Sequence, residues 1–418
     1  MAPRESSSSA PSRASRRVII AGAAAVLLAA AGTATALNAH HVVSASHSVV
    51  KARLASSSCT GPTGAAYVAV AGFQAFDAVN TANCDLVQQY NVGDRQVPGT
   101  GTSDFDFDST DEGVALSGKT LYFANTGNDT VAVIDSAALD VNNFENPAET
   151  LIQVGFNPED LAVTPDGSQV WVAETGPQTG KPSLGGISVI STATDKVTRT
   201  RSLPTDPREI AFSPSGAIAY VTTSEGLFVI SAANLRVITV IHGLGNPQGV
   251  VVAPDGKTVY VTNTVQGRVE VISAARNKVT RTIRVGELPW QLVISADGSK
   301  IYVADGDSNA ISVISAASDK VTNTIPDPGD PVSVALTPDG SELWVGGLTS
   351  GIVTVFDTAT GNSVGSFNVG FGGEPNAGDG EEPTGIVMTT TPAPGSSPDA
   401  AAKPNVAKPN AASATGSR

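Results

Sequence analysis

The sequence has few of the residues that bind metals or form disulfide networks. Two cysteines and four histidines in 418 residues exclude a cysteine-rich zinc cluster and a disulfide-dense scaffold, and they leave little for haem or histidine-based metal catalysis. No His-Glu-x-x-His or Cys-x-x-Cys-His motif occurs, and a Gly-x-Ser-x-Gly string occurs once, at residues 361–365. Three of the histidines precede residue 48, and only His242 lies further along the chain. The sequence therefore lacks the zinc-protease and haem-attachment motifs.

Charge is also scarce. Charged residues make up 15% of the chain, against roughly 25% in average proteins. The net charge is -14, and no run of Lys or Arg follows residue 17, so we expect no nucleic-acid partner. The hydrophobic fraction of 41% excludes disorder throughout, while 42 Gly and 26 Pro indicate many tight turns.

The first 39 residues have the order of an export signal. Four arginines precede an apolar run over residues 18–31, and small residues including Ala34-Thr35-Ala36 follow it. The segment Ser15-Arg16-Arg17-Val18 resembles a twin-arginine signal. A plain secretory signal and an uncleaved anchor are the alternatives, since residues 18–37 are long enough to span a bilayer. After cleavage we expect no membrane span and a secreted, extracellular or periplasmic location.

Export would place Cys59 and Cys84 in an oxidising compartment, where a lone pair in one region tends to bond. We therefore predict a Cys59–Cys84 disulfide. It would close a loop of roughly 25 residues and stabilise the fold by about 3 kcal/mol in the chain-entropy model.

The strongest pattern is an internal repeat. Seven of the nine Tyr and Trp residues each open a short β-branched run, at spacings of 55, 49, 49, 40, 42 and 42 residues: Tyr67, Tyr122, Trp171, Tyr220, Tyr260, Tyr302 and Trp344. Turns such as Pro254-Asp255-Gly256 precede most of these runs. Each unit holds four short strands with period-2 alternation and no helical periodicity, which predicts an all-β chain of four-stranded antiparallel blades.

The best copy of the repeat, Tyr260-Val-Thr-Asn263 with its preceding Pro-Asp-Gly, resembles the YVTN repeat of secreted and periplasmic seven-bladed β-propellers. The resemblance covers residues 65–389. It implies an exported, ring-shaped protein and no single shared reaction. With it, the domain organisation becomes an export signal (1–39), a linker (40–64), a propeller (65–389) and a disordered Pro/Ala-rich tail (390–418).

The ends of the repeat region predict how the ring closes. The first unit, residues 65–92, lacks an innermost strand, and a surplus strand at residues 383–389 resembles the innermost strand at 247–253. We expect residues 384–389 to pair with residues 65–70 and to complete the first blade, which would remove open sheet edges from the ring. We also expect the seven repeat aromatics to pack between blades and the outer-strand Lys and Arg residues to discourage edge pairing.

Candidate binding residues follow the recurring prolines at one face of the expected ring. This insertion face consists of the loops from each outer strand to the next innermost strand and of the loops after the aromatic strands. Unlike the repeat positions, its residues differ from blade to blade, and we select these as ligand-binding: Asp160, Arg208, Glu209, Gln248, Trp290 and Gln291. The alternative for Trp290 is surface packing.

Three insertions enlarge this face, at residues 91–112, 178–186 and 368–382, and two of them are acidic. Ring closure would bring both acidic segments to the first blade. We predict a hard divalent cation there, calcium before others, with these ligands: Asp104, Asp106, Asp108, Asp111, Glu112 and Glu381. A solvated acidic loop is the alternative, because three Asp residues on one extended strand would stand too far apart for one ion.

We therefore expect an exported, monomeric binding or interaction module for a small molecule, a glycan or a protein, with calcium as its candidate cofactor and no assigned catalytic residue. The alternative is a lactonase-like hydrolase or lyase, with Asp160, Arg208 and Glu209 as acid, base and anion contacts at the channel mouth. Convergence of these three residues in a closed pocket would favour the enzyme, whereas side chains splayed into solvent would favour binding.

Overall fold

The computed structural model describes residues 65–71, 75–81, 85–91, 113–139, 150–176, 184–369 and 382–389. All of these lie in one compact unit, Ala52–Arg418. Within them, none of the helices is of the length and hydropathy needed to cross a membrane. The export signal, the cysteine pair and the tail fall outside the described residues, so the corresponding expectations stay predictions.

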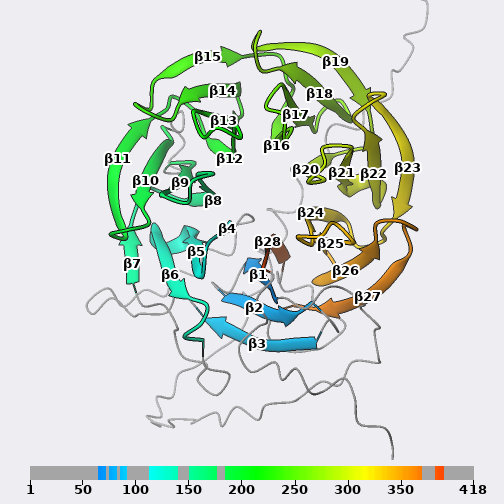
Figure 1. The fold of residues 1–418 in the computed structure, drawn as a ribbon, viewed down its shortest axis with the longest axis horizontal. Helices are drawn as coiled ribbons and strands as arrows, with labels where there is room; N and C mark the ends of the chain where they lie inside the picture. Colours follow the sequence, from blue (N-terminus) through cyan, green and yellow to red (C-terminus); the bar gives the residue numbers. More distant parts are fainter. Residues whose placement is uncertain are drawn as a thin grey trace, which may run out of the picture. The chain divides into compact units, whose positions relative to one another are not determined.

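The strands form seven sheets of four antiparallel strands (Figure 1). Blade A joins both ends of the domain, in the order β28 (Glu382–Thr389), β1 (Ala65–Ala71), β2 (Ala75–Asn80) and β3 (Asp85–Asn91). Blades B to G follow the chain from inside to outside: β4 (Val114–Ser117), β5 (Thr120–Asn125), β6 (Thr130–Asp135) and β7 (Thr150–Gln153) in B; β8 (Pro158–Val163), β9 (Gln169–Glu174), β10 (Gly186–Ser191) and β11 (Lys196–Ser202) in C; β12 (Pro207–Phe212), β13 (Ile218–Thr223), β14 (Gly226–Ser231) and β15 (Val237–Ile241) in D; β16 (Pro247–Val252), β17 (Thr258–Asn263), β18 (Arg268–Ser273) and β19 (Lys278–Arg284) in E; β20 (Pro289–Ile294), β21 (Lys300–Asp305), β22 (Ala310–Ser315) and β23 (Lys320–Pro326) in F; β24 (Pro331–Leu336), β25 (Glu342–Gly347), β26 (Ile352–Asp357) and β27 (Ser363–Asn368) in G. Two single-turn 3₁₀ helices, η2 (Thr126–Asn128) and η3 (Gly306–Ser308), follow β5 and β21.

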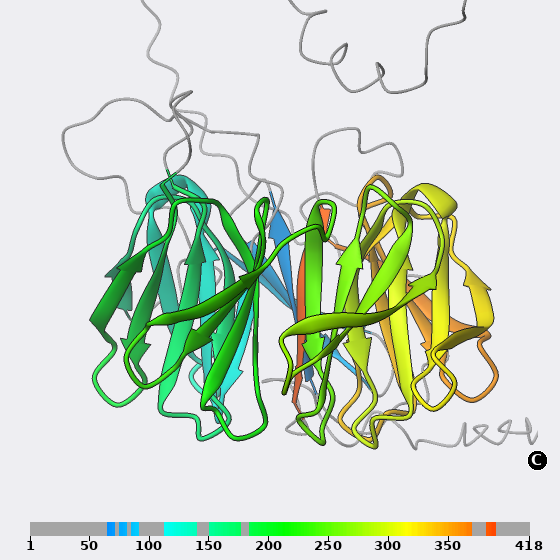
Figure 2. The same cartoon turned by 90° about the horizontal axis from the view of Figure 1, so that it is seen from above.

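The innermost strands form a closed circle. β28, β4, β8, β12, β16, β20 and β24 each contact the next, and β24 contacts β28 again (Figure 1). In the side view the strands run between the two loop-bearing faces of the ring (Figure 2). The chain is therefore a seven-bladed β-propeller, as the repeat predicts.

Closure of the ring also follows the prediction. β28 pairs antiparallel with β1, so that Thr389 lies opposite Ala65, and Gly385 lies opposite Ala69. The buried Ser333 hydroxyl donates to the carbonyl of Pro383 at 2.7 Å and so links β24 of blade G to β28. Strands from the two ends of the domain thus share one sheet.

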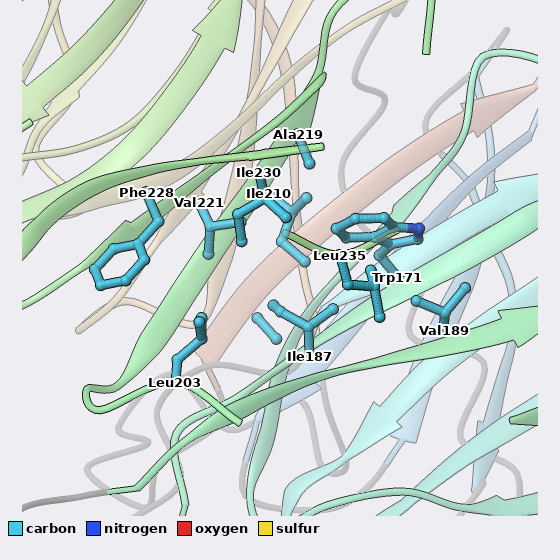
Figure 3. Close-up of a cluster of buried hydrophobic side chains, with 11 residues drawn as sticks. Trp171, Ile187, Val189, Leu203, Ile210, Ala219, Val221, Phe228, Ile230 and Leu235 are labelled. Carbon is cyan, nitrogen blue, oxygen red and sulfur yellow. The ribbon is translucent and has the colours of Figure 1, made fainter. Parts of the chain in front are cut away.

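Each repeat aromatic packs between its own blade and the next one. Trp171 of blade C, with no exposed surface, lies in a cluster with Ile187 of its own blade and with Val221 and Ile230 of blade D (Figure 3). The other six blade interfaces contain equivalent clusters built around the remaining aromatics. Burial of one large apolar side chain stabilises by about 1.5–3 kcal/mol, so these seven positions hold neighbouring blades together.

The Pro-Asp-Gly turns connect innermost and second strands at the face opposite the insertions. Gly167, Gly256 and Gly340 have φ values of +71°, +70° and +72°, a conformation that side chains with a Cβ rarely adopt. The preceding Asp accepts hydrogen bonds within the turn. Asp166, for example, accepts from the Thr164 hydroxyl at 2.6 Å and from Ser168, and these bonds lower its pKa to about 2. The Pro-Asp-Gly sequence is therefore explained by the geometry and the hydrogen bonds of the hairpin turn.

Candidate functional site: a polar cavity at the centre of the ring

A cavity of about 240 Å³ opens among the innermost strands. Every blade contributes to its lining, because residues of β4, β8, β12, β16, β20, β24 and β28 all face it. The lining residues come mainly from the first half of each strand, which begins at the insertion face. The cavity therefore lies toward that face of the ring.

All six residues selected from the sequence as ligand-binding line this cavity: Asp160, Arg208, Glu209, Gln248, Trp290 and Gln291. They come from β8, β12, β16 and β20, so four separate blades bring them together. Glu159 and Thr384, which also follow recurring prolines, line it too. Sequence reasoning missed the apolar part of the lining, which includes Leu161, Ile210, Leu292 and Val334. In the sequence, the only signal for these apolar lining residues is an apolar residue three positions after each recurring proline. That pattern is also typical of residues in the hydrophobic core.

A β-bulge presents these residues to the cavity. In β12, Arg208 and Glu209 together stand opposite the single residue Thr222 of β13. The same two-to-one arrangement occurs at Gln248-Gly249 in β16 and at Trp290-Gln291 in β20. A bulge releases side chains and backbone groups from the regular ladder. These three innermost strands therefore expose variable residues at the same height around the ring.

Buried hydroxyl groups satisfy the backbone that the bulges release. The Thr222 hydroxyl accepts from the Glu209 amide at 3.0 Å and donates to the Gln248 carbonyl of the next blade at 2.6 Å. The Gly249 amide donates to the Thr262 hydroxyl at 2.7 Å. Both threonines are fully buried, so their hydrogen bonds replace ladder bonds that the bulge breaks.

Two of the candidate charged residues also bind neighbouring parts of the ring. The Asp160 carboxylate accepts the Ile210 amide of blade D at 2.9 Å. The Arg208 guanidinium donates to Asn246 at 2.8 Å and forms an ion pair with Asp206 at 3.1 Å. Burial alone would raise the pKa of Asp206, but hydrogen bonds from Ser224 and the Arg208 charge lower it below the ordinary value. The Arg208 charge is therefore paired beside the cavity.

Trp290 differs from the other two tryptophans. The indole nitrogens of Trp171 and Trp344 donate to Gln169 and Glu342, whereas the Trp290 Nε1 is buried without a hydrogen-bond partner. Its ring packs against Gly306, where an added Cβ would lie 3.1 Å from Cδ1. Trp290 is therefore held in the cavity wall by close packing and has no polar anchor.

Buried carboxylates lie at the blade interfaces near the same face. Asp305, at the end of β21, is fully buried, and burial raises its pKa to about 6 although Ser312 donates to it at 2.5 Å. Burial likewise raises the pKa of Glu174, which accepts the Gly155 amide at 2.8 Å. Asp305 and Glu174 accept hydrogen bonds from the loops that precede the innermost strands and so hold these loops in place. The sequence analysis did not assign this role to them.

The predicted calcium ligands, Asp104, Asp106, Asp108, Asp111, Glu112 and Glu381, all fall outside the described residues. Across the ranges that the structure does describe, no group of three or more His, Cys, Asp or Glu side chains is placed to hold a metal ion. The calcium site therefore stays a prediction.

Comparison with known proteins supports the fold. No protein-family model matches the chain. The seven-bladed β-propeller protein Rv1057 of Mycobacterium tuberculosis (strain ATCC 25618 / H37Rv) is 29% identical over 115 residues, which are 27% of this chain and 28% of that protein. A functionally unknown protein from Desulfotomaculum acetoxidans DSM 771 superposes with a TM-score of 0.60 and 18% identity, over 79% of this chain and 100% of the other. Hydrazine synthase of Kuenenia stuttgartiensis gives a TM-score of 0.52 and 23% identity, over 63% and 80%. Identities this low show the fold alone.

Proposed function

We propose that this protein is an exported propeller of the YVTN-repeat type that acts as a binding module, with the central cavity as its ligand site. One observation carries the proposal: six polar or aromatic residues, chosen because they depart from the repeat, line a single cavity. Residues that serve only the ring would follow the repeat in every blade. The order of residues 1–39 supports export, and the Tyr-Val-Thr-Asn repeat supports the propeller type.

The alternative, a lactonase-like hydrolase or lyase, has weaker support. Asp160, Arg208 and Glu209 do meet in one cavity, the arrangement that favours an enzyme. However, Asp160 and Arg208 already bind Ile210, Asp206 and Asn246, and these contacts occupy part of their hydrogen-bonding capacity. The described lining also contains no His, Cys or Lys. Binding uses these residues as they stand, so we prefer it.

The test is ligand-induced stabilisation of the signal-free protein, residues 40–418. A panel of sugars, amino acids, amines, lactones and metal ions is screened by thermal unfolding, because a ligand at a hundred times its Kd stabilises the folded state by about 2.7 kcal/mol. We expect one class of compound to raise the Tm, and Gln291→Ala to abolish the rise. Glu225→Gln, an exposed change outside the cavity, is the matched control. Lactone hydrolysis that Glu209→Gln abolishes would instead establish the enzyme, and a panel without any effect would contradict the proposal.

A further inference from the structure

We infer that the part of the cavity wall formed by blades E and F recognises a single sugar ring, a pyranose with free hydroxyl groups. This inference rests on the proposed binding function and names the chemical class of the ligand. The E–F wall consists of Gln248 from β16 and of Trp290 and Gln291 from β20, and all three line the cavity. Each side chain is half-buried, so each keeps surface for a ligand.

Close packing at Gly249 brings the residues of the E–F wall together. A Cβ added to Gly249 would lie 2.6 Å from the Trp290 carbonyl oxygen and 3.1 Å from the Gln291 Cα. Such contacts are too short for a real Cβ, so glycine is what allows β16 to approach β20 this closely. Gln248 directly precedes Gly249 in the chain. The two carboxamides and the indole therefore come from adjoining backbone segments of adjacent blades.

The carboxamide of Gln291 is not used to hold the ring together. In other blades, the second residue after the recurring proline links neighbouring blades. Asp160 accepts the Ile210 amide at 2.9 Å, and the Ser333 hydroxyl donates to the Pro383 carbonyl at 2.7 Å. Gln291 holds the same position in blade F, and its side chain has no hydrogen-bond partner among the described residues.

The same contrast holds one position earlier in the strands. Arg208 directly follows the proline of β12, donates to Asn246 at 2.8 Å and pairs with Asp206 at 3.1 Å. Gln248 directly follows the proline of β16, and within the described part of the chain its carboxamide makes no hydrogen bond. A carboxamide that lines a cavity without a protein partner is available to a ligand.

Two such carboxamides favour hydroxyl groups over ions. Each carboxamide has an oxygen that accepts and an NH2 group that donates. A hydroxyl group also does both, so neighbouring hydroxyls of a sugar use both ends of a carboxamide, whereas a metal ion or an ammonium group uses only the oxygen. The Trp290 edge with Cδ1 and Nε1 packs near Gly306, and the rest of the ring offers apolar surface to the C–H groups of a sugar.

The size of the cavity matches one ring. At about 240 Å³ it is smaller than the roughly 300–1,000 Å³ of drug-sized sites. Apolar side chains elsewhere in the lining suit the C–H surface of a pyranose: Leu161, Ile210, Leu292 and Val334. The cavity therefore fits one sugar residue better than an oligosaccharide.

Probes with and without hydroxyl groups test this inference. The methyl glycosides of glucose, galactose, mannose and N-acetylglucosamine are titrated into the signal-free protein by calorimetry and by tryptophan fluorescence. Tetrahydropyran-2-methanol, a ring without the remaining hydroxyls, is the control compound. We expect at least one glycoside to bind and the control compound to show no binding at the same concentration. Trp171 and Trp344 have no exposed surface, so the fluorescence change reports on Trp290, and Trp290→Phe should abolish it.

Two variants test the carboxamides. Gln248→Met and Gln291→Met keep an unbranched side chain of similar length and remove both the donor and the acceptor. Each should weaken the glycoside roughly tenfold, which corresponds to about one hydrogen bond. Because neither carboxamide bonds to the described protein, both variants should keep the wild-type Tm. Glu225→Gln, exposed and outside the lining, should change neither affinity nor Tm.

The outcomes separate this inference from the proposed function. Equal binding of the glycosides and tetrahydropyran-2-methanol, or stabilisation only by another class of compound in the screening panel, would overturn the sugar and leave the binding module standing. Glycoside binding that both methionine variants retain would overturn the assignment to the E–F wall. Failure of every compound would overturn both proposals. If one variant does not fold, the other carries the test.

Discussion

At the scale of single residues, Asp305 shows how the ring places a carboxylate in an apolar interior. It ends β21, has no exposed surface and lies directly before Gly306, the residue against which Trp290 packs. Burial raises its pKa from 3.8 to about 6, while the Ser312 hydroxyl partly opposes that rise. Asp305 is therefore largely ionised at neutral pH, in a place that disfavours its charge.

Asp305→Asn should remove a pH-dependent loss of stability. Because the folded-state pKa is raised, the contribution of Asp305 to stability is complete below pH 3.8, the ordinary pKa of the group, and is lost as the pH rises through about 6. The unfolding free energy of the variant, relative to wild type, should therefore increase between pH 4 and pH 8. A shift from 3.8 to about 6 corresponds to about 3 kcal/mol. Urea unfolding across this pH range measures it.

Asp297→Asn is the matched control, with the opposite sign. Hydrogen bonds from Ser295 and Ser299 lower the pKa of this exposed turn residue to about 2. The contribution of Asp297 to stability is present above its ordinary pKa of 3.8 and is lost as the pH falls through about 2. Asp297→Asn should therefore be less stable than the wild type at pH 7. A parallel pH dependence in the two variants would contradict the assignment to Asp305.

At the scale of elements, the bulged starts of β12, β16 and β20 combine structure and site. The bulge in β12 places Arg208 and Glu209 at the cavity, and Thr222 on β13 satisfies the backbone behind them. The regular ladder resumes at Ile210, which faces Val221 and belongs to the core between blades C and D (Figure 3). One strand thus carries variable residues at its start and core residues after it.

Thr222→Val should destabilise the propeller and disturb the cavity. Valine has nearly the same shape but leaves the Glu209 amide and the Gln248 carbonyl without this hydroxyl, and each buried group left unpaired costs about 1–3 kcal/mol. We expect a loss of about 2–4 kcal/mol in urea unfolding. Thr200→Val on the exposed outer strand β11 is the control and should change stability by less than about 0.5 kcal/mol. Equal losses in the two variants would contradict a special role for Thr222.

The acidic segment 91–112 carries its own prediction, which rests on sequence alone. Asp104, Asp106 and Asp108 alternate with Phe, and Asp111 and Glu112 follow. Millimolar calcium should raise the Tm relative to a chelated sample, because binding to the folded state stabilises it. Replacing Asp104, Asp106 and Asp108 by Asn should abolish the rise. An unchanged Tm in excess calcium would leave a solvated acidic loop.

At the scale of the whole molecule, stability depends on closing the circle. β28 covers β1 in blade A, and its Ile386, Val387 and Met388 pack against the two clusters that join blade A to blades B and G. The Ser333–Pro383 hydrogen bond adds a polar link at the same junction. Blade A therefore connects the first and last parts of the domain, and its loss would leave open sheet edges.

Removing residues 382–418 should open the ring, whereas removing only residues 390–418 should not. The longer deletion takes away β28, exposes the edge of β1 and uncovers part of both clusters, so we expect the Tm to fall by more than about 10 °C or the protein to aggregate. The shorter deletion spares every described strand and should change the Tm by less than about 2 °C. Differential scanning calorimetry compares the two, and equal Tm values would contradict closure by β28.

The amino-acid sequence by itself determined the architecture of this protein. Seven repeat aromatics, the Pro-Asp-Gly turns and the surplus strand at the end predicted the blade number and the pairing of β28 with β1, because strand alternation and repeat spacing are local properties that one chain displays directly. Departure from the repeat likewise identified six residues of the cavity lining.

Only the tertiary structure decided how those residues are held. The bulges in β12, β16 and β20, the pairing of Arg208 with Asp206 and the burial of Asp305 all arise where separate strands or blades meet. The sequence contains Asp305 as one more residue of a Tyr-Val-Ala-Asp run, with no sign that its carboxylate is buried. Such contacts depend on close packing between surfaces far apart in the chain, which periodicity cannot specify.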